Sequence, residues 1–80
     1  MTNQAHQTCR AVTLKAEVVE LCDLLKFENL AQSGGEAKFF IAEGRVRVNG
    51  EVETRKRKKL HAGDVVEYAG QALRLVGKVS

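Results

Sequence analysis

The chain has 80 residues, 44% of them hydrophobic, with no proline and no tryptophan, so its size allows one compact domain with one hydrophobic core. This composition excludes collagen-like and disordered proteins, and no apolar run approaches the roughly 18 residues of a membrane-spanning helix. The net charge is only +3, but residues 38–60 hold eight cations and three anions, so an anionic partner is expected to bind this middle third.

The first ten residues, MTNQAHQTCR, are polar and show no hydrophobic period. Residues 1–10 are therefore predicted to form a flexible tail before a single domain over residues 11–80. The tail does not resemble a secretion signal, and the two cysteines, Cys9 and Cys22, form no CxxC motif, so a reduced, cytoplasmic protein is expected. His6 and Cys9 alone would make a poor metal site, and we predict neither a metal nor a cofactor.

Residues 11–14 are predicted to form a short edge strand, and residues 17–30 are predicted to form a helix. The apolar positions of this helix fall on one stripe: Val18, Leu21, Cys22 and Leu25. Because Cys22 lies inside the stripe, it is predicted to be a small core residue and not a reactive thiol.

A second helix is predicted between Ser33 and Gly44. Ser33 and Glu36 form the capping-box pattern S-x-x-E, which satisfies backbone amides at a helix start, and glycine is a typical residue to end a helix. The apolar face consists of Ala37, Phe40 and Ile41.

Phe39 is predicted to lie outside the main core. At about 100° per residue it points roughly 150° away from the centre of the apolar face, on the side of Glu36 and Glu43. A phenylalanine in such a position is expected to pack under a neighbouring segment, for example the tail. A role in base stacking or in docking a partner remains open.

Residues 45–48 alternate polar and apolar at the strand period and lead into Asn49 and Gly50, a strong turn signal. Both valines of this stretch are predicted to point inward and both arginines outward. A two-residue hairpin would pair Arg47 with Val52 and place that valine on the arginine face. We therefore expect the chain to leave the turn in another way.

Five consecutive cations occupy residues 55–59. Burying alternate cations without partners would cost several kcal/mol each, so a solvated loop or an exposed ribbon is predicted. A turn at Gly63 and Asp64 follows, and then two strands over residues 65–68 and 72–76, joined by a short hairpin. The predicted fold class is α+β, with two helices packed on a small antiparallel sheet.

A set of small, basic and turn residues occurs at fixed spacing in the middle of the chain: Ser33, Ala37, Lys38, Ile41, Gly44, Val46, Val48, Asn49 and Gly50, followed by Gly63 and Asp64. Over residues 18–68 this pattern resembles the S4-like RNA-binding domain, also called the αL motif. The stretches VELCDLLK (19–26) and VETRKR (52–57) are similar to its free-standing YbcJ-like group. Gly34 stands where the family commonly has an arginine, so one phosphate contact is expected to be missing.

The resemblance implies binding of structured RNA, of the rRNA or tRNA kind, and association with ribosomes. The binding surface that it implies joins the second helix, the next strand and the basic run through Lys38, Arg45, Arg47, Arg55, Lys56, Arg57, Lys58 and Lys59. Ser33, Gly34 and Asn49 are candidates for minor contacts, although Ser33 is first a helix cap and Asn49 a turn residue. RNA is favoured over DNA because the helix offers only Lys38 to a major groove.

No paired carboxylates beside a histidine and no Ser/His/Asp set point to catalysis. A domain that is not an enzyme, has no small-molecule substrate and does not bind membranes is therefore expected. The alternative function is a protein-interaction adaptor that uses the basic face on an acidic partner, for example in ribosome assembly, with Phe39 as a docking point.

Overall fold

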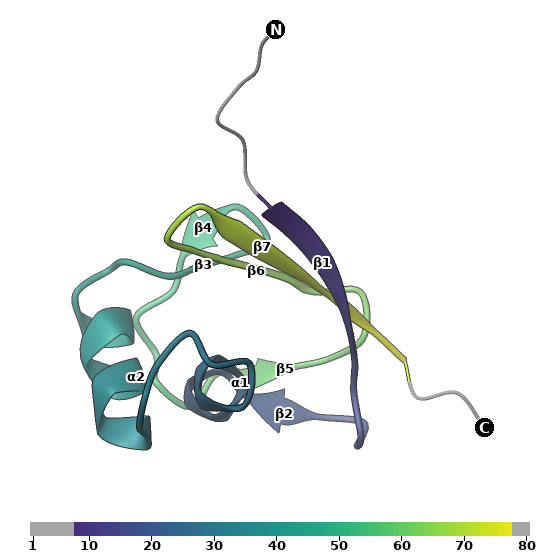
Figure 1. Cartoon of the computed structure of the whole chain (residues 1–80), viewed down its shortest axis with the longest axis horizontal. Helices are drawn as coiled ribbons and strands as arrows, with labels where there is room; N and C mark the ends of the chain where they lie inside the picture. The colour runs from purple at the N-terminus through teal and green to yellow at the C-terminus, as the bar shows by residue number, and fades with distance from the viewer. Residues whose placement is uncertain (1–7, 78–80) are drawn as a thin grey trace, which may run out of the picture.

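The computed structural model describes residues 8–77 of the chain (Figure 1). The helices and strands, in chain order, are β1 (Thr8–Thr13), β2 (Val19–Glu20), α1 (Leu21–Phe27), α2 (Gly34–Ala42), β3 (Arg47–Val48), β4 (Glu51–Val52), β5 (Lys59–Leu60), β6 (Val65–Tyr68) and β7 (Gln71–Val76). Both helices lie on one side of a five-stranded sheet, and the two-stranded ribbon of β2 and β5 lies beside α1 (Figure 1). None of the helices within residues 8–77 is long and apolar enough to cross a membrane.

The α+β fold class is confirmed, but the sheet is mixed and not wholly antiparallel. Its strand order is β1-β7-β6-β3-β4, and β1 runs parallel to β7 while the other neighbours are antiparallel. A parallel pair needs a long crossover connection. Here both helices and all the strands between β1 and β7 form that connection, so the two ends of the domain pair with each other.

Strand β1 begins earlier than the sequence predicts. Its register with β7 starts at Thr8 opposite Gln71, so residues 8–10, which were expected in the tail, belong to the sheet. Their polar sequence gives no hydrophobic signal because an edge strand is held mainly by main-chain pairing on one side. The rest of the predicted tail, residues 1–7, lies outside the described residues.

Helix α1 is shorter than the predicted helix over residues 17–30. Residues 19 and 20 pair with β5 as strand β2, so the helix begins only at Leu21. At its other end Asn29 adopts a positive φ of 62°, which stops the helix. Cys22 is buried as predicted, whereas Val18, expected on the apolar stripe, is 38% exposed.

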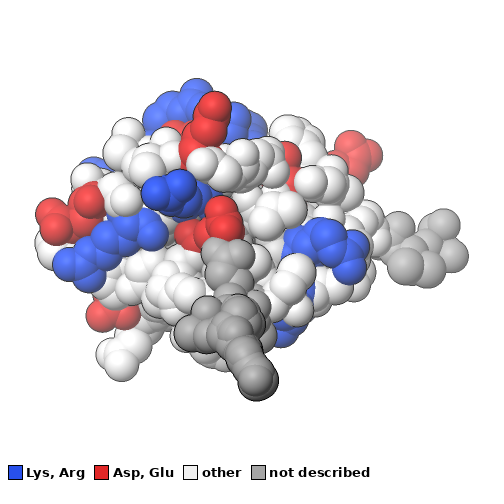
Figure 2. Space-filling model, turned by 90° about the horizontal axis from the view of Figure 1, so that it is seen from above, with Lys and Arg blue, Asp and Glu red and all other residues white. Residues whose placement is uncertain are grey.

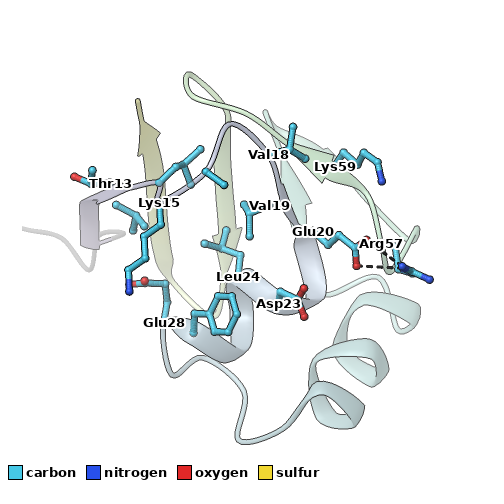
Figure 3. Close-up of a pocket in the computed structure, with 14 residues that line it drawn as sticks. Thr13, Lys15, Val18, Val19, Glu20, Asp23, Leu24, Glu28, Arg57 and Lys59 are labelled. Atoms are coloured by element: carbon cyan, nitrogen blue, oxygen red, sulfur yellow. Dashed lines mark hydrogen bonds and ion pairs between the residues drawn. The ribbon is translucent and has the colours of Figure 1, made fainter. Parts of the chain in front are cut away.

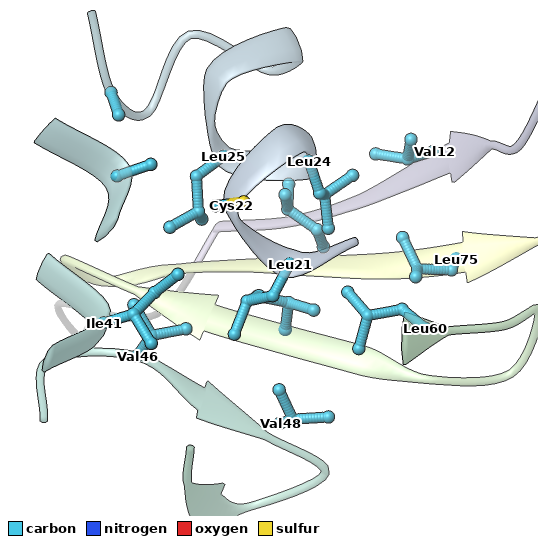
Figure 4. Packing of buried hydrophobic residues seen from close by; sticks show 14 of the residues in the cluster. Val12, Leu21, Cys22, Leu24, Leu25, Ile41, Val46, Val48, Leu60 and Leu75 are labelled. Atoms are coloured by element: carbon cyan, nitrogen blue, oxygen red, sulfur yellow. The ribbon is translucent and has the colours of Figure 1, made fainter. Parts of the chain in front are cut away.

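The core lies between α1, α2 and the sheet. In Figure 4 the leucines of α1 point toward the strands of the sheet, with Ile41 from α2 and Leu60 from β5 on either side. The largest fully buried side chains are Leu21, Leu25, Ile41, Leu60, Leu73, Leu75, Val46 and Val66. Because these residues come from both helices and four strands or their flanks, the core fixes the relative positions of all the segments that carry cations.

Helix α2 matches the prediction closely. The Ser33 hydroxyl accepts a hydrogen bond of 3.1 Å from the Glu36 amide, and the Glu36 carboxylate accepts one of 2.8 Å from the Gln32 amide. The helix ends before Gly44, whose φ is +77°, as expected for a glycine after a helix.

The strand register of the β3–β4 hairpin differs from the prediction. Arg47 pairs with Val52 in the simple two-residue register that the sequence disfavoured, with Asn49 and Gly50 at φ 53° and 85°. Val52 is accordingly 53% exposed. This exposure of a valine is confined to a ribbon of two residue pairs, and Gly44 lies beside it, where an added Cβ would be in ordinary van der Waals contact, 3.6 Å from a Val52 methyl.

Candidate nucleic-acid interface

The basic loop, defined here as residues 53–59, runs from β4 into β5 and is attached to the start of α1 through its main chain. The carbonyl of Lys58 accepts a hydrogen bond of 2.9 Å from the Leu21 amide, and that of Lys56 accepts one of 3.1 Å from the Cys22 amide. The first amides of a helix need such acceptors, and no side chain caps α1. The loop is therefore fixed by carbonyls that face the helix, while its cationic side chains remain at the surface.

These side chains surround a shallow hollow. Its volume is about 470 Å³, and its lining residues are Arg55, Arg57, Lys58, Lys59 and His61. The cations in the loop are exposed, apart from the partly buried Lys58. Such a concave cationic surface matches the charge of a phosphate chain.

Within the loop, Arg55 is bound by Glu53. The guanidinium donates hydrogen bonds of 2.9 and 3.1 Å to the two carboxylate oxygens, and the Arg55 amide donates a third of 2.9 Å. These hydrogen bonds, with the positive charges of Arg55 and Lys58, lower the pKa of Glu53 to about 2. Arg55 is thus positioned by its own neighbour and is less open to a ligand than the sequence suggests.

Arg57 forms a similar pair with Glu20, which precedes α1. The Nε and one terminal nitrogen of Arg57 donate hydrogen bonds of 3.1 and 3.2 Å to the two carboxylate oxygens of Glu20 (Figure 3). The hydrogen bond from Arg57 lowers the pKa of Glu20 against the opposing effect of burial, and the charges of Lys59 and Lys38 lower it further. Lys38 of α2 therefore lies close enough to act on the same carboxylate as the loop cations.

The remaining two predicted cations, Arg45 and Arg47, lie apart from the loop hollow. With Glu67, Tyr68 and the turn at residues 69–70 they line a separate hollow of about 300 Å³. Arg45 lies 3.8 Å from the Glu43 carboxylate, and Arg47 faces Glu67 in the register of β3 and β6.

The structure thus divides the predicted site residues into two groups. The loop group comprises Lys38, Arg55, Lys56, Arg57, Lys58 and Lys59, and the strand group comprises Arg45 and Arg47. Figure 2 shows one face of the molecule, on which blue basic side chains form several separate groups with red acidic side chains between them. A single surface of unpaired cations was expected from the sequence, but Arg45, Arg55 and Arg57 each have a glutamate of the chain within 4 Å.

Sequence reasoning missed these pairings for two different reasons. Glu43 and Glu53 each stand two residues before their arginine, an E-x-R pattern that is visible in the sequence. Glu20, in contrast, is 37 positions from Arg57 and is brought there by the pairing of β2 with β5.

Comparison with known proteins identifies the family. A sequence model described as S4 domain matches residues 12–76. The chain belongs to the S4 domain family. YbcJ of Escherichia coli (strain K12) is 57% identical over 58 residues, which cover 72% of this chain and 83% of YbcJ. The "Probable ribosome maturation protein RlbA" of Bacillus subtilis (strain 168) is 42% identical over 59 residues, which cover 74% of this chain and 83% of RlbA.

Two solved structures resemble this S4 domain. The solution structure of YbcJ from E. coli, described as revealing an αL motif involved in RNA binding, has a TM-score of 0.61 and 45% identity over 95% of each chain. The 30S ribosomal protein S4e from Thermoplasma acidophilum has a TM-score of 0.54 and 27% identity over 72% of this chain and 31% of S4e. The predicted resemblance to the S4-like family and its YbcJ-like group is confirmed.

Two sequence motifs of this S4 domain contact each other. The Asn49 side chain donates a hydrogen bond of 3.0 Å to the Asp64 carboxylate and accepts one of 2.9 Å from the Val65 amide. Burial acts to raise the pKa of Asp64, but the hydrogen bonds from Asn49 and the His61 amide, with nearby positive charge, lower it overall. Asn49 therefore joins two turns, which agrees with its predicted role in a turn and leaves little of its amide for a ligand.

The other candidates for minor contacts lie at the start of α2. The Ser33 hydroxyl caps the helix, as predicted. Gly34, where the resemblance stated from the sequence led us to expect an arginine, has open space around it, because a Cβ built there would meet no atom within 4 Å. The surrounding structure would therefore accommodate a larger side chain at residue 34.

A larger groove of this S4 domain lies elsewhere. It measures about 840 Å³ and runs between β1, β2 and α1, with Val18 and Phe27 exposed along it and Arg57 and Lys59 at one end (Figure 3). No group of three His, Cys, Asp or Glu side chains that could hold a metal ion occurs in residues 8–77. His6, one of the two tail residues considered as ligands, is outside this range.

Proposed function

We propose that this S4 domain binds structured RNA through the loop group, assisted by the strand group, and does so in the cytoplasm without catalysing a reaction. The observation that carries the proposal is the attachment of the basic loop to α1 by main-chain hydrogen bonds. This attachment places the side chains of five consecutive cations at the surface on a fixed backbone. A ligand then binds without first having to order the loop, so less conformational entropy is lost on binding.

The internal ion pairs do not argue against this function. Arg55 and Arg57 are exposed, and exposed ion pairs contribute little to stability because water and salt screen them. A phosphate can replace Glu20 or Glu53 as the partner of an exposed guanidinium, although it must compete with a carboxylate that is itself mostly buried. Until then the glutamates hold the two guanidinium groups in defined positions.

The comparisons support an RNA ligand of the ribosomal kind. YbcJ is described with an RNA-binding αL motif, RlbA is named for ribosome maturation, and S4e is a protein of the 30S subunit. We infer that the RNA is structured rRNA, or an RNA folded like tRNA, whose backbone the loop group follows. An adaptor for an acidic protein, the alternative from the sequence, has less support because no comparison names such a partner.

Titration of the chain with a folded rRNA fragment at increasing salt tests this proposal. Because phosphate contacts release counterions, log K should fall linearly with log salt, by about 0.7 to 0.9 for each phosphate contacted. An acidic protein or polyglutamate of equal charge serves as the competitor. Affinity for RNA that does not change with salt, or equal binding of the acidic polypeptide, would contradict the proposal.

A further inference from the structure

Phe39 is the most unusual exposed side chain near the strand group. It lies on α2 and is 53% exposed, so the prediction that another segment covers it is wrong for the described part of the chain. Its ring meets the ring of Phe40 edge to face, with centroids 6.1 Å apart. Phe40 in turn stacks on Tyr68 of β6, with ring centroids 4.9 Å apart. The ring of Phe39 is thus supported by two further aromatic side chains.

A guanidinium completes this aromatic cluster. The central carbon of Arg45 lies 5.7 Å from the ring centroids of both Phe39 and Phe40. Arginine at this distance interacts favourably with a ring, and its planar group can itself stack on a base. Phe39 and Arg45 together therefore present an aromatic face and a planar cation side by side.

Two glutamates, one in α2 and one just after it, lie near this cluster, and only Glu43 pairs with its guanidinium. The Glu36 carboxylate accepts a hydrogen bond from the Gln32 amide, and the Glu36 amide donates one to the Ser33 hydroxyl, whereas the Glu43 carboxylate lies 3.8 Å from the Arg45 guanidinium. Next to the cluster, the strand-group hollow of about 300 Å³ is lined by Arg45 and Arg47 and by one carboxylate, that of Glu67. A ligand on Phe39 thus has a cationic hollow directly beside it.

We propose that Phe39 and Arg45 form a stacking site for one unpaired RNA base, and that the strand group binds the phosphate attached to the same nucleotide. The inference rests on the proposed function and specifies which feature of the RNA this second site requires. An unpaired nucleotide is the ligand that offers a flat π-face and an adjoining anion together. In a continuous duplex the bases are stacked inside and unavailable to a surface ring.

The test compares two blunt-ended RNA duplexes with the same number of phosphates: one with a single bulged 2-aminopurine, and one fully paired, with a 5′-phosphate added to equalise the count. Stacking of a base on an aromatic side chain is worth roughly a tenfold change in affinity. The wild-type chain should bind the bulged RNA about tenfold more tightly, and the fluorescence of the 2-aminopurine should change on binding.

Three variants separate stacking from simple apolar contact. Phe39→Leu keeps an apolar side chain but removes the ring, and it should abolish the preference for the bulge. Phe39→Trp should retain the preference. Phe27→Leu is the matched control, because Phe27 is also exposed and has the Lys26 ammonium 5.7 Å from its ring centroid, but it lies outside both hollows.

The outcomes separate the two proposals. If the wild type binds both RNAs equally and in a salt-dependent manner, or if Phe39→Leu keeps the preference, the stacking site is wrong while RNA binding stands. If Phe39→Leu and Phe27→Leu reduced the preference for the bulged RNA equally, the stacking site would also be wrong. If the wild type binds neither RNA, the proposed function fails and the stacking site fails with it.

Discussion

The loop group and the strand group hold their cations in different ways. In the loop group the main chain is attached to α1, and the side chains of Arg55 and Arg57 are oriented by glutamates. In the strand group Arg45 lies over aromatic rings, and Arg47 is fixed by the β3–β6 pairing. The two proposals assign a different contact to each group: phosphates to the loop group, and one nucleotide with its base to the strand group and Phe39.

The largest expected loss of RNA affinity comes from reversing the charges of the loop group, and it distinguishes this group from the strand group. The triple change Arg55→Glu, Arg57→Glu and Lys58→Glu should weaken binding of folded rRNA by at least about 100-fold at low salt and flatten the salt dependence, because several phosphate contacts are lost. Reversing both strand-group arginines should cost less, about tenfold. Affinity measured across a salt series checks both values.

A matched triple variant controls for net charge. Arg10→Glu, Lys26→Glu and Arg74→Glu change the charge by the same amount at β1, α1 and β7, and should weaken binding only slightly. Circular dichroism verifies that all variants are folded. Equal losses in the loop and control variants would show that overall charge, and not the loop group, determines affinity.

A smaller gain in affinity is expected from releasing Arg57. Glu20→Gln removes the carboxylate that binds this guanidinium, so affinity for folded rRNA should rise by about two- to fivefold. Glu28→Gln removes an equal charge but releases Arg10, and serves as the control in the same titration. If Glu28→Gln raises affinity as much as Glu20→Gln, the Arg57 guanidinium has no special role.

The smallest effect concerns stability and not binding. Because the pKa of Glu53 is lowered from 4.5 to about 2, its ionised form stabilises the folded state fully above pH 4.5, and this contribution is lost as the pH falls toward 2. Thermal unfolding of Glu53→Gln should therefore depend less on pH between 4.5 and 2 than that of the wild type. Glu51→Gln, in the same hairpin, is the control, and an unchanged pH dependence in Glu53→Gln would contradict the assignment.

The parts of the fold with local signals were predictable from the sequence. The capping box of α2, the turn residues 49–50 and the strands β6 and β7 each depend on neighbouring residues, and all appear, although the register after the turn differs from the prediction. The start of α1 was not predictable in this way, because β2 forms only by pairing with β5, about 40 positions later. The parallel partner of β1 is likewise set by the path of the whole chain.

The exposure of the basic loop was predictable from the sequence, but the glutamates that pair with its arginines were not all predictable. The basic loop is exposed because its cations cannot be buried, a conclusion that needs no structure. The separation of the basic loop from Arg45 and Arg47 depends on where the helices and strands lie in the fold. The contact of Glu20 with Arg57 depends on the same arrangement. Phe39 was recognised as lying off the apolar face, but its approach to Arg45 follows from the turn after α2, which the helical period alone does not describe.

The hydrogen bonds between the loop carbonyls and α1 have a consequence for how this architecture can diversify. Any residue except proline offers the same main chain, so the scaffold is indifferent to which side chains occupy residues 56 and 58. Substitutions there can alter the ligand preference of the domain while its core and strand order persist. One framework can in this way present different surfaces through a few side-chain changes.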